Sequence, residues 1–97
     1  MHKVIYTRTA RRSLRRIAKD RVATIIGSIN ELASLEDPLA HQNVKAMKGD
    51  WLGSYRLRIG GYRAIFGLNP DPEAKPEQKL LLISVAVIGS RGGIYKK

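Results

Sequence analysis

Three arginines lie on two short β-rich segments where their side chains can bind one phosphate group together. Residues 55–66 read YRLRIGGYRAIF, in which a Gly-Gly pair separates two stretches of alternating side chains. This pair predicts a two-residue hairpin turn, with positive φ expected at both glycines. Pairing across the turn sets Arg58 opposite Arg63, and strand alternation puts Arg56 on the same face. We expect a guanidinium cluster there, and guanidinium groups bind phosphate oxygens well.

The other face of the same hairpin is apolar and is expected to pack against helices. Its members are Tyr55, Leu57, Ile59, Tyr62, Ala64 and Phe66. On the arginine face, like charges opposite each other destabilise a strand pair, on a scale of roughly 0.2–1 kcal/mol, and a bound polyanion would relieve that repulsion. The alternative is that Arg58 and Arg63 extend into solvent or meet a carboxylate from elsewhere in the chain.

The composition of the chain also favours a polyanionic partner. It has 18 Lys and Arg against 8 Asp and Glu, a formal charge of +10. Such a charge attracts nucleic acid, where phosphate contacts supply most of the non-specific affinity. A solvated basic surface, or a small protein that only coats RNA, remains an alternative. A membrane surface is the weaker alternative, because no strongly apolar face accompanies the charge.

Absent residue types exclude other kinds of chemistry. The chain has no cysteine, which excludes disulfides and thiolate metal sites. The two histidines, His2 and His41, lie far apart and have no partner at ligand spacing. We therefore expect neither a metal nor a cofactor. Since a core of this size often needs external support, a partner protein is the expected stabiliser, and a self-sufficient core is the alternative.

The length and the terminal sequence predict one cytoplasmic domain. The range 1–97 is short enough for a single domain. The first residues, MHKVIYTRTARRS, contain too short an apolar run for a secretory signal. No segment approaches the roughly 20 apolar residues of a membrane span.

The first half of the chain predicts a strand and two helices. Residues 3–6 (KVIY) read as a strand, and either Thr7 or Thr9 can cap the helix that follows. Asp20 is the expected cap of the second helix, which should stop near Leu35 because Pro38 follows shortly afterwards. The apolar positions of the two helices are Ala10, Leu14 and Ile17 in the first, and Val22, Ile25, Ile26, Ile29, Leu32 and Ala33 in the second. Arginines and a lysine cover the opposite side of the first helix, as a partner surface or a solvated face.

The second half predicts a small sheet. Residues 38–53 show no sustained period and read as an irregular connector, and the three prolines of residues 69–79 indicate a long loop. The apolar run 80–88 (LLLISVAVI) indicates an interior strand buried on both faces. The Gly-rich end, 89–97, is expected to be flexible. The fold class is therefore α+β, in the order β-α-α-β-β-β, with both helices on one face of a small, mainly antiparallel sheet.

One known family has these features. The stretch VKAMKGDWLGSYRLRIGGYRAIF, followed by an apolar strand and SRGGIY, resembles the RelE/ParE superfamily of toxins, and RelE-like ribonucleases most closely. The resemblance covers the chain in element order and is specific over residues 44–95. It implies a toxin of a type II toxin–antitoxin system that enters the ribosomal A site, cleaves mRNA there and is held silent by a cognate antitoxin protein.

The resemblance also assigns site residues. Arg56 and Arg58 occupy the paired basic positions of the first central strand, and Arg63 matches the arginine of the GYR motif. Arg91 and Tyr95 match an arginine and an aromatic residue spaced four apart. The implied RNA-backbone contacts are Lys45 and Lys48, in the basic stretch before the hairpin.

The implied chemistry is metal-independent cleavage by attack of the ribose 2′-OH on its own phosphate. Arginines suit the stabilisation of the phosphorane oxygens, and Tyr95 suits base stacking or ribose orientation. RelE-like nucleases often carry lysine where this chain has Arg56 and Arg58, and arginine is a poor general base. Ser90 also stands where many relatives carry histidine, so the base is left open. The candidates are Tyr95, Lys45, Lys48, His41 and a group on the ribosome.

Two other functions fit the same residues. A ParE-like inhibitor of DNA gyrase has the same fold without nuclease chemistry, and a non-catalytic RNA-binding protein needs only the charge. Fold alone does not separate them, because function resides in the site.

Overall fold

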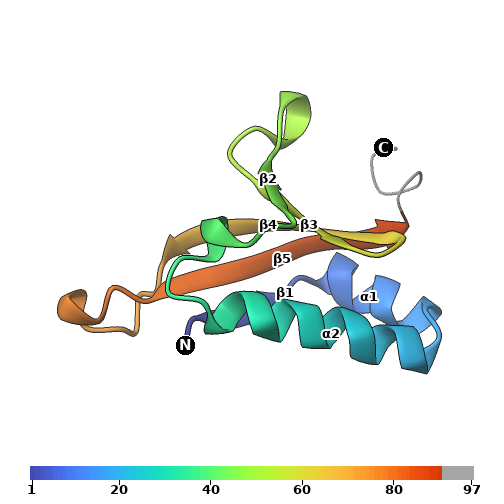
Figure 1. The fold of residues 1–97 in the computed structure, drawn as a ribbon, viewed down its shortest axis with the longest axis horizontal. Helices are drawn as coiled ribbons and strands as arrows, with labels where there is room; N and C mark the ends of the chain where they lie inside the picture. Colours follow the sequence, from blue (N-terminus) through green and yellow to red (C-terminus); the bar gives the residue numbers. More distant parts are fainter. Residues whose placement is uncertain (91–97) are drawn as a thin grey trace.

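The computed structural model describes residues 1–90 as two helices packed on one face of a five-stranded mixed sheet (Figure 1). The strand order is β1-β5-β4-β3-β2. The elements are β1 (Lys3–Tyr6), α1 (Arg8–Arg16), α2 (Lys19–Ser34), β2 (Val44–Ala46), β3 (Tyr55–Ile59), β4 (Tyr62–Pro70) and β5 (Leu81–Ser90), with short 3-10 turns at Pro38–Ala40, Gly49–Trp51 and Pro76–Gln78. The predicted fold class is confirmed.

Helix α1 begins and packs as its sequence predicts. The Thr7 side chain caps it, because Thr7 Oγ1 accepts a hydrogen bond from the Ala10 amide at 3.1 Å. Ala10 is fully buried, and Leu14 and Ile17 pack against the core. The basic side chains of the opposite side are exposed, namely Arg8, Arg11, Arg12, Arg15 and Arg16.

Helix α2 starts earlier than its sequence predicts. Its N-cap is Ala18, which makes no side-chain capping bond, so the prediction of Asp20 as the cap is wrong. Only Ile17 and Ala18 separate the helices, and Ile17 is in extended conformation. Asp20 instead lies in the first turn, where its charge interacts favourably with the helix dipole. The helix ends at Ser34 and is capped at Leu35, as predicted.

The core lies between α2 and the sheet. Four α2 residues are almost fully buried, namely Ile25, Ile29, Leu32 and Ala33. They share one cluster with Leu57, Ile59, Ala64 and Phe66, and Tyr55 and Tyr62 pack against its edge. Tyr55 and Phe66 rings lie 5.8 Å apart between centroids. The apolar face of the predicted hairpin is therefore its core face.

The hairpin has the predicted register and a different turn. Leu57 pairs with Ala64 and Arg58 with Arg63, as inferred from the central glycines. Gly60 has a φ of +58°, whereas Gly61 is not in the positive-φ region. The expectation of positive φ at both positions is thus wrong, and positive φ at the first central residue alone is typical of a type II′ turn.

Strand β5 is interior, as predicted, but it is not buried on both faces. It runs parallel to β1 and antiparallel to β4. Ile83, Val85 and Ile88 are buried, whereas the residues between them are half-buried, because helices cover only one face. Strand β4 is longer than expected: it continues to Pro70, which lies opposite Leu81, and so takes in the start of the predicted loop.

The connector before the hairpin contains a strand that the sequence did not reveal. Strand β2 pairs antiparallel with β3 and forms one edge of the sheet. At three residues it is too short to display a period. The loop between β2 and β3 projects away from the sheet on the side opposite the helices (Figure 1). Within residues 1–90, no helix is both long and apolar enough to cross a membrane.

Candidate nucleic-acid interface

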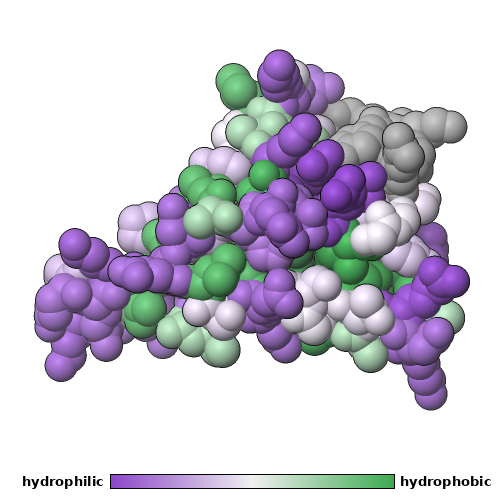
Figure 2. All heavy atoms as spheres, in the orientation of Figure 1, coloured by the Kyte–Doolittle hydropathy of each residue, from purple (hydrophilic) through white to green (hydrophobic). Residues whose placement is uncertain are grey.

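The face of the sheet that carries no helix gathers the predicted basic residues. Partners across antiparallel strands share a face. Lys45 of β2 lies opposite Arg56, and Arg58 lies opposite Arg63. Strongly hydrophilic side chains gather over the β3–β4 hairpin beside the β2–β3 loop (Figure 2). Strand β2 therefore adds Lys45 to the three-arginine face.

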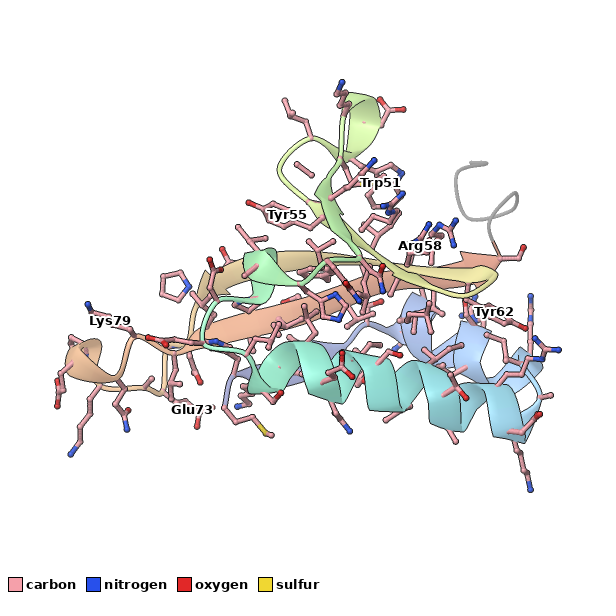
Figure 3. The ribbon with its side chains drawn as sticks, viewed as in Figure 1. Trp51, Tyr55, Arg58, Tyr62, Glu73 and Lys79 are labelled. Carbon is pink, nitrogen blue, oxygen red and sulfur yellow. The ribbon has the colours of Figure 1, made fainter. Side chains whose placement is uncertain are left out.

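Arg58 is exposed and is held by a neutral acceptor. Its Nη2 donates to Asn43 Oδ1 at 3.3 Å, and its backbone amide donates to the Asn43 carbonyl at 3.0 Å. Figure 3 shows Arg58 and Trp51 on the side of the sheet opposite the helices. An amide oxygen orients a guanidinium without neutralising it, so Arg58 keeps its full charge for a phosphate.

Arg63 is buried and fastened to the hairpin turn. It is 7% exposed, and its Nη1 donates to the carbonyls of Gly60 and Tyr62, both at 2.9 Å. Its side chain is therefore oriented before any ligand arrives, and it also stabilises the turn. The second role was not predicted, because sequence alone does not show which way a long side chain folds back.

Arg56 has a buried donor with no acceptor. Its Nε finds no hydrogen-bond partner among residues 1–90. Leaving such a donor unsatisfied costs about 1–3 kcal/mol. Lys45 directly across the strand pair adds like-charge repulsion. An anion bound beside the two side chains would reduce this repulsion.

Neutral oxygens hold the side chains of Arg58 and Arg63. Within residues 1–90, Lys3 forms an ion pair with Glu73, and His41 Nε2 lies 3.2 Å from Glu31 Oε1; neither contact engages an arginine. No three His, Asp or Glu side chains of this part of the chain come together as a metal site.

The remaining predicted residues divide into two groups. Lys48 is exposed at the start of the Gly49–Trp51 turn, and Lys45 is exposed on the edge strand. Arg91 and Tyr95 lie outside the described residues, as does the predicted flexible tail from residue 91 on. The prediction is wrong for residues 89 and 90, which belong to β5. Ser90 pairs with Tyr62, so the described chain ends beside the hairpin.

His41 is occupied by structural contacts. His41 Nδ1 accepts a hydrogen bond from the backbone amide of Asn43 at 3.0 Å, and His41 Nε2 lies 3.2 Å from Glu31 Oε1. Its side chain is only 9% exposed. Since both ring nitrogens already have partners, His41 is a poor general base. Asn43, which binds Arg58, was missed, because a lone Asn in a connector carries no sequence signal.

No protein-family model matches the chain, and no curated protein matches it in sequence. Comparison with solved structures does find similar chains. One belongs to the toxin–antitoxin complex RelBE2 of Mycobacterium tuberculosis, with a TM-score of 0.65 and 20% identity over 93% of this chain and 98% of that one. Another belongs to the archaeal RelE–RelB complex of Pyrococcus horikoshii, with a TM-score of 0.67 and 20% identity over 95% and 97% of the two chains.

A third similar structure is YafQ of E. coli, with a TM-score of 0.63 and 9% identity over 99% of this chain and 100% of that one. All three matches span nearly the whole of both chains, so the common feature is the complete arrangement of helices and sheet. The chain therefore has the fold of RelE-like toxins.

Proposed function

We propose that this chain is the toxin of a type II toxin–antitoxin system, and that it acts in the cytoplasm as an endoribonuclease on mRNA in the ribosomal A site. The observation that carries the proposal is the arrangement of the hairpin arginines. Arg58 and Arg63 are oriented by neutral oxygens, and Arg56 lies opposite Lys45 on the same two strands. Cations held in this way suit a phosphate whose charge increases during reaction.

The proposed reaction needs no added co-reactant. The ribose 2′-oxygen attacks the adjacent phosphorus, the bond from phosphorus to the 5′-oxygen breaks, and the products are a 2′,3′-cyclic phosphate and a 5′-hydroxyl. In this scheme Arg56, Arg58 and Arg63 stabilise the phosphorane oxygens. Each oriented donor of this kind contributes about 10²–10³ in rate.

The other proposed roles concern binding and proton transfer. Lys45 and Lys48 contact the RNA backbone, Arg91 contributes a further cation, and Tyr95 stacks on a base or orients the ribose. We exclude His41 as the general base, because both of its ring nitrogens already contact other groups, namely the Asn43 backbone amide and the Glu31 carboxylate. The remaining candidates are Lys45, Lys48, Tyr95 and a group on the ribosome.

The proposed partner is a cognate antitoxin. The solved complexes with this fold include RelBE2 and RelE–RelB pairs of toxin and antitoxin. With a formal charge of +10, this chain suits an antitoxin segment that is acidic and amphipathic. Salt should weaken such a complex, and binding that salt does not affect would indicate a mainly apolar interface.

Expression without an antitoxin tests the proposal in cells. We expect growth to stop and translated mRNAs to be cut inside codons. Intact messages together with damaged DNA would support gyrase inhibition instead. Normal growth with intact messages would exclude both toxin functions and favour a non-catalytic RNA-binding protein.

A further inference from the structure

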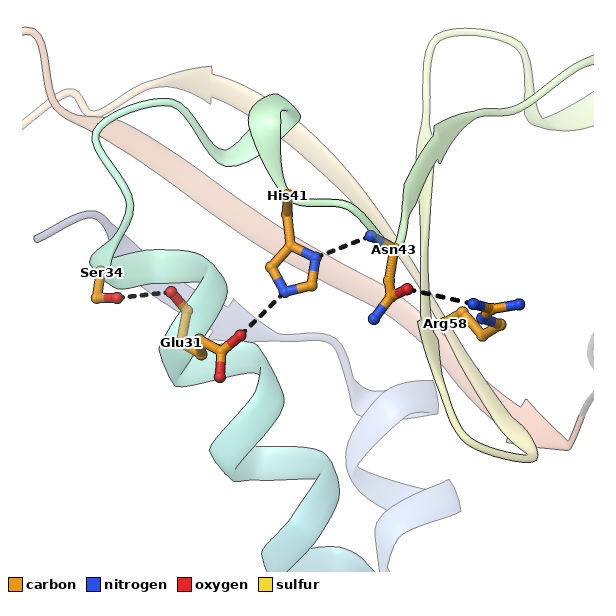
Figure 4. Close-up of polar contacts among 5 residues, drawn as sticks. All are labelled: Glu31, Ser34, His41, Asn43 and Arg58. Atoms are coloured by element: carbon orange, nitrogen blue, oxygen red, sulfur yellow. Dashed lines mark hydrogen bonds and ion pairs between the residues drawn. The ribbon is translucent and has the colours of Figure 1, made fainter.

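A chain of polar contacts connects helix α2 to the guanidinium of Arg58 (Figure 4). Glu31 Oε1 of α2 lies 3.2 Å from His41 Nε2. His41 Nδ1 accepts a hydrogen bond from the backbone amide of Asn43 at 3.0 Å. Asn43 Oδ1 accepts a hydrogen bond from Arg58 Nη2 at 3.3 Å. The chain crosses from the helix side of the sheet to the proposed phosphate site. The β2–β3 register brings Asn43 opposite Arg58, and the contacts through His41 extend from there to Glu31 on α2.

The proton positions in this chain follow from its donors. The Asn43 amide N–H donates to His41 Nδ1, which must therefore offer a lone pair. The ring proton of neutral His41 then lies on Nε2 and is donated to the Glu31 carboxylate. Glu31 thereby selects the tautomer of His41 that can bind the Asn43 backbone.

Asn43 in turn holds Arg58 at two points. The Asn43 carbonyl accepts from the Arg58 backbone amide at 3.0 Å, and its side-chain oxygen accepts from Arg58 Nη2. The first contact fixes the Cα of Arg58 and the second fixes its guanidinium. An exposed arginine without such an acceptor would sample many rotamers, and ordering it on a phosphate would cost side-chain entropy.

We infer that Asn43 is a positioning residue of this site, presented by His41 and Glu31, and that it acts by orienting Arg58 toward the phosphate of the bound RNA. This inference rests on the proposed function. A neutral acceptor suits the role, because a carboxylate at the same place would neutralise the charge that the phosphate needs.

A double-mutant cycle tests whether Asn43 acts through Arg58. We expect Asn43→Ala to lower kcat/KM for cleavage of ribosome-bound mRNA about tenfold to a hundredfold, the loss typical of a misplaced catalytic group. In the Arg58→Ala background the same change should cost less than about twofold, because the residue that it orients is gone. Equal losses in both backgrounds would overturn the inference. Gln42→Ala, at an exposed neighbouring amide, is the control and should match the wild type.

A conservative replacement tests the role of His41. Asparagine can place its Oδ1 near the position of His41 Nδ1, so His41→Asn should recover most of the activity that His41→Ala loses. Equal activity of the two variants, with equal melting temperatures, would remove His41 from the chain of contacts.

A spectroscopic readout keeps this inference separate from the proposed nuclease activity. Nitrogen-15 NMR of the arginine side chains should show slow guanidinium rotation for Arg58 in the wild type and fast rotation in Asn43→Ala. If the wild type leaves mRNA intact, the nuclease proposal fails, while the NMR comparison still decides whether Asn43 holds Arg58. Equally fast rotation in both proteins would overturn the inference whatever the activity.

Discussion

Arg58 and Arg63 lie directly opposite each other across the β3–β4 hairpin, and each guanidinium is held by a neutral oxygen. The Arg58 guanidinium donates to the side chain of Asn43, next to the edge strand β2. The Arg63 guanidinium instead donates to the Gly60 carbonyl in the turn. Holding the two like charges at different acceptors limits their repulsion without cancelling either charge. The hairpin therefore presents two oriented cations, and their distinct contacts lead to distinct mutational effects.

Replacing Arg58 should remove activity with little effect on folding. We expect Arg58→Gln to lower the rate of mRNA cleavage about 10²–10³-fold, the loss typical of one oriented electrostatic donor. Its melting temperature should stay close to that of the wild type, because Arg58 is exposed. Lys79→Gln is the matched control, since it removes the same charge at the other end of the sheet (Figure 3). Similar losses in both variants would mean that only net charge matters.

Replacing Arg63 should affect both activity and stability. Arg63→Ala removes the bonds to the Gly60 and Tyr62 carbonyls. We expect the free energy of unfolding to fall by about 1–3 kcal/mol, measured by urea denaturation. Cleavage should also fall under conditions in which the variant is fully folded. An unchanged unfolding midpoint would contradict the structural role that we assign to Arg63.

Lys48 should contribute to RNA affinity through charge alone. A plot of log affinity against log salt concentration has a negative slope, and we expect Lys48→Gln to make it shallower by about 0.7. This is the value for one phosphate contact with single-stranded nucleic acid. Titrations of a short oligoribonucleotide at several salt concentrations measure this slope. A slope equal to that of the wild type would place Lys48 outside the RNA contact.

Stability should decrease at high pH partly because of Tyr6. Burial raises the pKa of Tyr6 above its ordinary value of 10.0. The unfolded chain therefore loses the phenolic proton first, so this contribution to stability is complete below about pH 10 and is lost as the pH rises through the folded pKa. Tyr6→Phe should show a smaller decrease in unfolding free energy above pH 10 than the wild type. Parallel curves would contradict this assignment.

The parts of the fold that could be predicted depend on local patterns. The central glycines determine the register that sets Arg58 opposite Arg63, and the apolar stripe of α2 identifies its buried face. Strand β2 could not be predicted, because three residues carry no period. The position of the α2 cap was also missed, because the turn between the helices depends on how Ile17 packs against the core.

For the candidate site, the sequence predicts which residue types lie on which face of the sheet, but not their contacts. Alternation along the strands placed Arg56, Arg58 and Arg63 on the face without helices. It did not show that Arg63 folds back on the turn, or that Asn43 binds Arg58 from fifteen residues away. Such contacts depend on how separate elements pack in space, which no local pattern encodes.

Primer extension on a defined mRNA, with and without purified ribosomes, tests the nuclease proposal most directly. We predict new 3′ ends within the A-site codon when the wild-type chain and ribosomes are both present, and none when Arg56 and Arg58 are both replaced by Gln. Intact mRNA on ribosomes that contain the bound wild-type chain, or equal cleavage by the double variant, would contradict the account.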